Sequence, residues 1–383
     1  MAEEPFTFAA AQTSPAYHDR NKTLDITCEW IERADRKRVD LLVFPEAFFS
    51  GFPYWKGLVS SERWVDQLVE LQRNALGVTD DAVEVIGDAV DEADLHIVLG
   101  VNERDERPGS ETLYNSMFYF DRNGELVRRH RKLVPTTDER AIWGRGDPAD
   151  LATHDTDVGR IGGLVCYENH MTLAKAALCA MGEEVHPAVW PGFWHQDGSS
   201  PGRKQTTESN DSITHCDIYP GMREYAFETQ TFVVSCSPYI DDDQLADYYE
   251  YGVVGNIATG GSMIIDPTGI IQAGPVLGEE TLLTAEFSRY DRRAAKTYFD
   301  AMGHYTRWDA VQLQIDDSRV DPTVNGGERD RHCPVQERRW NRPTAFEIET
   351  IADDAGVSVE TVERVVDRIV TNQEIESPPA DDQ

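Results

Sequence analysis

The stretch Ile161-Gly162-Gly163-Leu164-Val165-Cys166-Tyr167-Glu168-Asn169 joins an apolar run to an alanine-rich helical pattern. Cys166 is therefore predicted at a turn from a strand into a helix. At such a turn the helix N-terminus favours a thiolate, and exposed backbone N–H groups can bind a developing negative charge. These properties suit a nucleophile, whereas the alternative is a small buried residue beside a Gly-Gly strand.

A second segment, Leu41-Leu42-Val43-Phe44-Pro45-Glu46-Ala47-Phe48-Phe49, puts a carboxylate just past an apolar strand. Pro45 ends the strand because proline lacks the N–H that a sheet requires. Glu46 is expected at the carboxyl end of this strand, among aromatic side chains. Such an environment raises the pKa of a carboxyl group, which suits a general base near neutral pH.

A third segment is the basic run Arg128-Arg129-His130-Arg131-Lys132-Leu133-Val134-Pro135. We interpret Arg128 to Arg131 as a solvated edge strand, with His130 in a structural role. Lys132 stands apart, because the chain has only 7 Lys among its 36 Lys and Arg residues. A compact ammonium can stabilise an anionic tetrahedral intermediate and help to keep a neighbouring thiol ionised.

Together, Glu46, Lys132 and Cys166 in these motifs resemble the Glu-Lys-Cys triad of the carbon–nitrogen hydrolase (nitrilase) superfamily. The resemblance runs from about residue 6 to about residue 300. Strands alternating with helices along the chain predict an α/β fold. The resemblance implies a four-layer αββα sandwich with the site at strand ends, and chemistry that needs no metal or organic cofactor.

Several segments resemble the nitrilase branch in particular. Cys166-Tyr167-Glu168-Asn169 is similar to the nitrilase Cys-Trp-Glu-Asn, and Glu139 in Glu139-Arg140-Ala141-Ile142-Trp143-Gly144-Arg145-Gly146-Asp147 matches a second active-site carboxylate. The aromatic loop Gly51-Phe52-Pro53-Tyr54-Trp55 and the segment Val189-Trp190-Pro191-Gly192-Phe193 also look like nitrilase segments. We therefore predict Glu46, Lys132, Cys166 and Glu139 as catalytic residues, and Tyr54, Tyr167, Trp190 and Phe193 as substrate-binding residues.

The resemblance implies hydrolysis of a small-molecule nitrile to its carboxylic acid and ammonia, through a thioimidate and then a thioester on the thiol. Within enzymes, the main alternative is an aliphatic amidase, or another carbon–nitrogen hydrolase acting on an amide, because an amide enters the same thioester. Tyr167 replaces the usual Trp, which affects substrate range more than reaction type.

The composition is strongly acidic, with 69 Asp and Glu against 36 Lys and Arg and a net charge of −33. Such a chain repels itself at low ionic strength, whereas the Debye length falls to about 3 Å at 1 M salt. We interpret the charge as adaptation to a salt-rich cytoplasm; basic partners are the alternative. The sequence has no signal-peptide pattern, membrane-length apolar run or CxxC pair, which predicts a cytoplasmic protein with no membrane partner.

We predict a catalytic domain over residues 1–315, an extended arm over 316–343 and an acidic helical tail over 344–383. The segment from Ala352 to Val362 resembles a helix-turn-helix, which raises a different hypothesis, a DNA-binding regulator. Residues 344–383 hold eleven acidic and two basic residues, the wrong sign for phosphate contacts. We therefore expect no nucleic-acid partner and favour a small helical tail for oligomerisation or capping, in a homo-oligomer of two or more subunits.

Overall fold

The structure is a computed structural model that describes residues 5–56, 60–192, 217–240, 258–316 and 358–359 of the 383-residue chain. The chain divides into two units, Met1–Val320 and Asp321–Gln383. Only Ser358 and Val359 of the second unit are described. The predicted arm (316–343) and tail (344–383) therefore lie outside the described residues, apart from these two positions and Asp316.

Two sheets form the centre of the first unit. One consists, in spatial order, of β13 (Thr281–Phe287), β1 (Phe6–Gln12), β2 (Leu41–Val43), β3 (His96–Arg104), β4 (Leu113–Phe120) and β5 (Leu126–Arg131). The other consists of β12 (Ile271–Leu277), β11 (Gly260–Ile265), β10 (Phe232–Cys236), β9 (Val185–Val189), β7 (Gly159–Ile161) and β6 (His154–Thr156), with β8 (Leu164–Val165) paired to β9.

The α-helices among the described residues are α1 (Arg20–Asp35), α2 (Ser61–Asn74), α3 (Asp81–Ala93), α4 (Thr172–Ala180), α5 (Ile218–Thr229) and α6 (Arg289–Tyr298). Three 3₁₀ turns also matter for the site: η1 (Thr137–Ala141), η2 (Pro148–Asp150) and η3 (Cys166–His170). None of these helices is both long and apolar enough to span a membrane.

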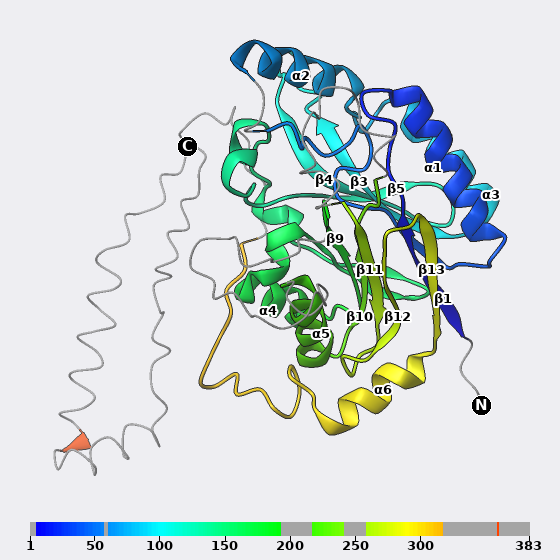
Figure 1. The fold of residues 1–383 in the computed structure, drawn as a ribbon. Helices are drawn as coiled ribbons and strands as arrows, with labels where there is room; N and C mark the ends of the chain where they lie inside the picture. The colour runs from blue at the N-terminus through cyan, green and yellow to red at the C-terminus, as the bar shows by residue number, and fades with distance from the viewer. Residues whose placement is uncertain (1–4, 57–59, 193–216, 241–257, 317–357, 360–383) are drawn as a thin grey trace, which may run out of the picture. The chain divides into compact units, whose positions relative to one another are not determined.

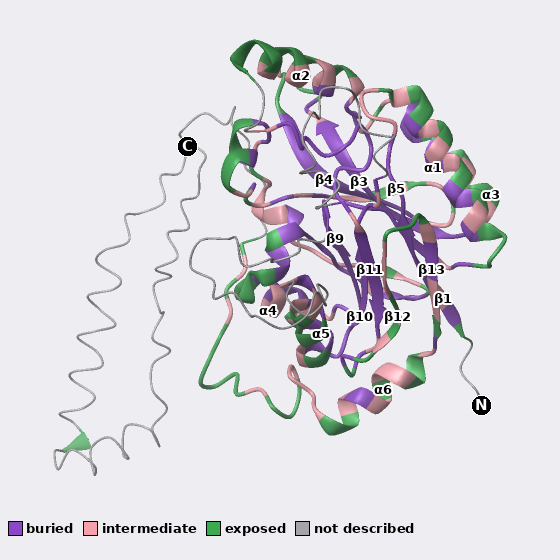
Figure 2. Ribbon diagram, viewed as in Figure 1, coloured by how far each residue is buried: buried purple, intermediate pink, exposed green. Residues whose placement is uncertain are grey.

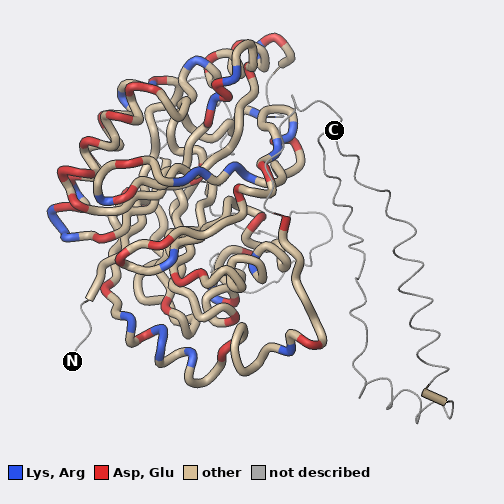
Figure 3. The backbone as a smooth tube through the Cα atoms, turned by 180° about the vertical axis from the view of Figure 1, so that it is seen from behind, with Lys and Arg blue, Asp and Glu red and all other residues tan. Residues whose placement is uncertain are grey.

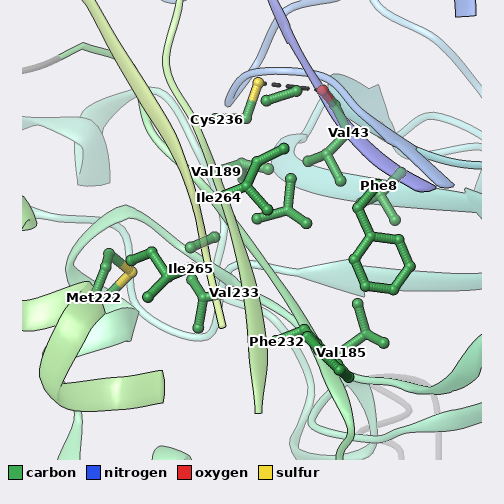
Figure 4. Packing of buried hydrophobic residues seen from close by; sticks show 14 of the residues in the cluster. Phe8, Val43, Val185, Val189, Met222, Phe232, Val233, Cys236, Ile264 and Ile265 are labelled. Atoms are coloured by element: carbon green, nitrogen blue, oxygen red, sulfur yellow. Dashed lines mark hydrogen bonds between the residues drawn. The ribbon is translucent and has the colours of Figure 1, made fainter. Parts of the chain in front are cut away.

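The packing follows from alternation along β1, which is buried on both faces. Phe8 and Ala10 belong to the cluster between the two sheets, while Ala9 and Ala11 pack on the side of α1 and α3. In Figure 4, Phe8 and Val43 of the first sheet face side chains of the second, and Met222 reaches the same cluster from α5. The layers are therefore helices α1 and α3, sheet, sheet, and helices α4 and α5 (Figure 1).

The four layers determine which parts of the strands and helices are buried. The inner strands β1–β4 and β8–β11 are buried along almost their whole length, whereas β5, β6, β12 and β13 at the sheet edges are partly exposed and the helices expose one side (Figure 2). Each fully buried Val, Leu or Ile side chain contributes about 1.5–3 kcal/mol by leaving water. The predicted αββα sandwich is confirmed.

The directions of the strands place the loops with the predicted site residues near one another. β1, β2 and β3 run parallel, and β5 is parallel to β3 because β4 is antiparallel to both of its neighbours. The carboxyl ends of β2 and β5 therefore point to one edge of the first sheet. β8 and β9 run parallel in the second sheet and are followed directly by Cys166 and Trp190.

Glycines set two local features of the sheets. The Asn123-Gly124 turn joins β4 to β5, and Gly124 has a φ of 72°, which suits glycine. The run from Ile161 to Val165 differs, because Gly163 has a φ of 115° and breaks the predicted strand into β7 and β8.

Candidate active site

Glu46 follows the carboxyl end of β2, as predicted. Its backbone N–H donates to the carbonyl oxygen of Trp190 at 3.2 Å, which ties this loop to the end of β9. Gly100 in β3 allows the loop to lie flat on the sheet, since a Cβ there would collide with the backbone of Pro45. The side chain of Glu46 is completely buried.

Lys132 follows β5 and is completely buried. Its Nζ donates to Glu46 Oε1 at 3.0 Å and to Glu139 Oε2 at 2.7 Å. Its backbone N–H donates to the carbonyl oxygen of Asn115 in β4 at 2.8 Å, which continues the strand pairing. The ammonium is thus held between two carboxylates that come from different parts of the chain.

Glu139 lies in η1 and caps that turn with its own carboxylate. Oε2 accepts the backbone N–H of Thr136 at 2.8 Å as well as the Lys132 ammonium. Oε1 lies 3.3 Å from the Nζ of Lys56, which also lies over the ring of Phe52. Glu139 therefore links Lys132 to the segment after the aromatic loop.

Cys166 lies at the end of β8 and is buried, with 1% of its surface exposed. Its φ is +54°, a left-handed conformation that costs a non-glycine residue about 1–3 kcal/mol. Ala47, directly after Glu46, and Thr137, at the start of η1, have φ values of 48° and 45°. Such conformations persist only where surrounding contacts hold them, and they cluster at functional sites.

Buried polar side chains hold the Cys166 turn. Asn169 Nδ2 donates to the carbonyl oxygen of Cys166 at 2.8 Å, and its Oδ1 lies 2.8 Å from His186 Nε2. His186 Nδ1 lies 2.8 Å from Glu183 Oε1, and that oxygen also accepts the backbone N–H of Gly163. The turn is thus fixed on both sides of the thiol.

The electrostatic environment shifts the pKa values of Glu46 and Glu139 in opposite directions. Burial raises the pKa of Glu46 to about 7, with a contribution from Glu139, although Lys132 and Asn115 lower it. Burial also acts to raise the pKa of Glu139, but the ammonium groups of Lys132 and Lys56 outweigh it and leave that pKa below its usual value. Glu46 therefore suits proton transfer near neutral pH, whereas Glu139 remains an anion.

Lys132 remains a cation. Burial would lower its pKa, but the neighbouring Cys166, Glu46 and Glu139 outweigh burial and raise the pKa of the ammonium above its usual value. A fixed positive charge in a dry site stabilises developing negative charge strongly.

The thiol of Cys166 differs from the expectation. Burial and the charge of Glu46 raise its pKa well above the usual value, although Lys132 and the backbone N–H of Tyr167 act to lower it. In addition, Cys166 begins the short turn η3, and the α-helix α4 starts only at Thr172. No helix N-terminus lies at the thiol, and its raised pKa disfavours the thiolate form.

The basic run before Lys132 was also interpreted wrongly. None of the three Arg side chains is freely solvated: Arg129 and Arg131 both bind the buried carboxylate of Glu103, and Arg128 lies over the ring of Tyr119. β5 is nevertheless the edge strand of its sheet. The positive charges of Arg129 and Arg131 are balanced by the buried carboxylate of Glu103, which is distant from them in the sequence.

The structure also brings in residues that sequence analysis missed. Asn115 Nδ2 donates to Glu46 Oε1 at 2.6 Å. Lys56 contacts Glu139 at the site's outer side. The signal for Lys56 was available, because it is one of only 7 Lys and directly follows the aromatic loop. Asn115 lies in an ordinary strand pattern and gave no signal.

The predicted substrate-binding residues occupy different environments. Tyr54 and Trp190 are buried, with 6% and 1% of their surfaces exposed, and the hydroxyl of Tyr54 donates to the carbonyl oxygen of Pro191. Tyr167 has 43% of its surface exposed. Phe193 lies outside the described residues. In the described part of the chain, no group of three or more His, Cys, Asp or Glu side chains is arranged to hold a metal ion.

Comparison with known proteins identifies related sequences. The chain is 34% identical to Nitrilase 3 of an unknown prokaryotic organism over 315 residues, which cover 80% of this chain and 89% of that protein. It is 32% identical to Nitrilase 2 of Arabidopsis thaliana, covering 82% and 89%, and 32% identical to an aliphatic nitrilase of Rhodococcus rhodochrous, covering 80% and 78%.

Solved structures share the fold. Nit3 of Saccharomyces cerevisiae, a member of branch 10 of the nitrilase superfamily, aligns with a TM-score of 0.60 at 20% identity, covering 79% of this chain and 97% of Nit3. An amidase from Nesterenkonia sp. aligns with a TM-score of 0.53 at 17% identity, covering 78% and 97%. The carbon–nitrogen hydrolase family matches residues 7–297, so the chain belongs to this family and is a hydrolase of carbon–nitrogen bonds.

Proposed function

We propose that this hydrolase converts a small nitrile to its carboxylic acid and ammonia, using Cys166 as nucleophile. The observation that carries the proposal is the buried group of Glu46, Lys132 and Glu139 beside the Cys166 thiol. Relatives at 31–34% identity that carry the name nitrilase support the nitrile as substrate.

In the first step, Glu46 accepts the proton of the Cys166 thiol and the resulting thiolate attacks the nitrile carbon. A C–S bond forms, one C–N π bond breaks, and the nitrogen takes up a proton to give a thioimidate. The raised pKa of Glu46, about 7, suits both uptake and return of this proton. The positive charge of Lys132 and the backbone N–H of Tyr167 stabilise the thiolate.

Water then adds to the thioimidate carbon, and Glu46 accepts a proton from it. Glu46 returns this proton to the nitrogen of the tetrahedral intermediate, the C–N bond breaks, and ammonia departs to leave a thioester on Cys166. A second water attacks the thioester, the C–S bond breaks, and the acid departs as the thiol recovers its proton. Each tetrahedral stage carries negative charge beside Lys132, while Glu139 orients that ammonium.

We place the substrate side chain against Tyr54, Tyr167, Trp190 and Phe193. Tyr54 belongs to a buried aromatic group with Phe52, which supports apolar contacts with the substrate side chain. Tyr167 has the most exposed side chain among the described members of this set, and it offers a hydroxyl where related motifs have an indole.

The second candidate is hydrolysis of an amide, which reaches the same thioester after loss of ammonia. It is favoured by the fold shared with an amidase, although 17% identity supports only the fold. A panel of nitriles and their matching amides, assayed for ammonia release in high salt, separates the two. The nitrile proposal fails if amides are hydrolysed and nitriles are not. The Cys166→Ala variant measures the background release of ammonia from both kinds of substrate.

We also propose that the protein works in a salt-rich cytoplasm as a homo-oligomer. Acidic residues recur along the whole described backbone in Figure 3, which supports adaptation to salt. We propose residues 1–315 as the catalytic domain and the tail over 344–383 as an assembly element. Deletion of 344–383 should then reduce the size of the assembly on size exclusion.

A further inference from the structure

The carboxylate of Glu168 lies between the two segments that carry Lys132 and Cys166. It is buried, with 1% of its surface exposed. Oε1 accepts the backbone N–H of Leu133 at 2.6 Å, and Leu133 directly follows Lys132. Oε2 accepts the backbone N–H of Val165 at 2.8 Å, and Val165 directly precedes Cys166. One side chain thus bridges two segments from different sheets.

His130 adds a third contact to the same carboxylate. Its Nε2 lies 2.9 Å from Glu168 Oε2, and its Nδ1 lies 2.9 Å from the carbonyl oxygen of Asp150 in η2. The ring of His130 thus lies between the Glu168 carboxylate and a backbone carbonyl, both of which are hydrogen-bond acceptors. His130 is completely buried, two residues before Lys132.

The Glu168 carboxylate thus has several hydrogen-bond partners. Burial would raise the pKa of Glu168, but His130 and the N–H groups of Val165 and Leu133 outweigh burial and lower it. The group is therefore a fixed anion whose two oxygens each hold one segment of the site. Its role in the chemistry differs from that of Glu46, because its contacts are with backbone N–H groups and an imidazole rather than with the Lys132 ammonium.

We propose that Glu168, supported by His130, is a positioning residue that sets the location of the Lys132 ammonium relative to the Cys166 thiol. The proposal rests on the proposed function, since Lys132 and Cys166 are active groups only there. Lys132 acts to lower the pKa of the Cys166 thiol, and this effect depends on distance. A shift of about 1 Å in a reacting group can cost about 10²-fold in rate.

The test is Glu168→Gln in the full-length protein. A glutamine has one acceptor oxygen, so one N–H group now meets an NH₂ group and one segment is released. The matched control is Glu103→Gln. Glu103 is equally buried, and its partners among the described residues are the side chains of Ser116, Arg129 and Arg131.

Two measurements separate positioning from stability. The first is the rate of alkylation of Cys166 by iodoacetamide as a function of pH, followed by peptide mass spectrometry, with the half-exposed Cys28 as internal reference. The second is the split between kcat and KM at matched fractions of folded protein. The alkylation profile is read without turnover, so it tests the proposal even if no nitrile or amide is hydrolysed.

We expect Glu168→Gln to move the Cys166 profile to higher pH and to lower kcat about 30- to 100-fold with KM changed less than about threefold. Glu103→Gln should leave the profile in place. Superimposed profiles for wild type and Glu168→Gln, or an equal shift in Glu103→Gln, would overturn the proposal. If Glu168→Gln does not fold, the pH profile of Cys166 alkylation is measured in His130→Gln instead. A smaller shift of that profile to higher pH supports the proposal, and an unchanged profile refutes it.

Discussion

The side-chain amide of Asn115 donates to Glu46 Oε1 at 2.6 Å, on the same oxygen that the Lys132 ammonium binds at 3.0 Å. Both donors thus occupy one oxygen, and within the described residues Glu46 Oε2 has no hydrogen-bond partner. We infer that Oε2 is the oxygen that accepts the proton of the Cys166 thiol. By binding Oε1, Asn115 therefore helps to leave Oε2 of Glu46 as the oxygen that can accept a proton.

Asn115→Ala should make Glu46 a weaker catalyst and change its titration. Loss of a hydrogen bond to a charged group costs about 1.5–3 kcal/mol, which corresponds to about 10- to 100-fold in kcat/KM. Because Asn115 lowers the pKa of Glu46, its removal should raise that pKa and move the acidic limb of the pH–rate profile to higher pH. Ser116→Ala, the next residue in β4, whose hydroxyl contacts Glu103, is the control.

The pH dependence of the wild type should report the titration of Glu46. Its raised pKa of about 7 means that the carboxylate form, the base, predominates above pH 7 and disappears below it. kcat/KM should therefore fall about tenfold per pH unit below this value and reach a plateau above it. Glu46→Gln should remove this limb and lower kcat by about 10²-fold or more. An unchanged limb in Glu46→Gln would assign it to another group.

Replacement of the nucleophile should abolish turnover. We expect Cys166→Ala to lose at least about 10⁴-fold in kcat, since the covalent route is closed. In the wild type, a slow substrate should leave an adduct on the Cys166 peptide in intact-mass and peptide analysis. Cys236→Ala is the matched control, because Cys236 is an equally buried free thiol between the sheets. Measurable turnover by Cys166→Ala would exclude the assigned nucleophile.

Lys132 and Glu139 should behave as one unit. We expect Lys132→Met to lower kcat by about 10²- to 10³-fold, because a preorganised charge is removed from a dry site. Glu139→Gln should lower it less, since it only loosens that charge. The double variant should resemble Lys132→Met, because groups that act on one step are not additive. Lys175→Met, which removes a surface pairing with Glu228, should retain activity.

Dilution of salt should destabilise the protein. With a net charge of −33, self-repulsion grows as the Debye length rises from about 2 Å near 2 M salt to over 10 Å at about 50 mM. We expect the melting temperature and the activity to fall together over this range in KCl. NaCl at the same ionic strength should act as KCl does, because screening depends on ionic strength. An unchanged melting curve at about 50 mM would refute the salt adaptation.

Some errors of the sequence analysis have a common origin. Arg129 and Arg131 were expected in water because neighbouring residues gave no sign of Glu103, which lies two strands away in the sheet. The local pattern at Cys166 predicted a helix N-terminus that favours the thiolate, whereas the turn there is η3 and burial beside Glu46 raises the pKa of the thiol. In both cases the deciding partner is distant in sequence.

Local pattern was sufficient for the alternation of strands and helices and for three segments with special residues at strand ends, whereas the four layers were implied only by the family resemblance. Apolar periodicity and turn chemistry act over a few residues, so they can be read from the chain directly. The grouping of Glu46 with Asn115 and Lys132 spans 69 and 86 residues. It arises because β2 and β5 run in the same direction and bring their carboxyl ends to one edge of the sheet, where the antiparallel strand β4 begins. Protonation states and the bridge of Glu168 depend on burial and on backbone N–H groups placed by that packing, so only the tertiary structure decides them.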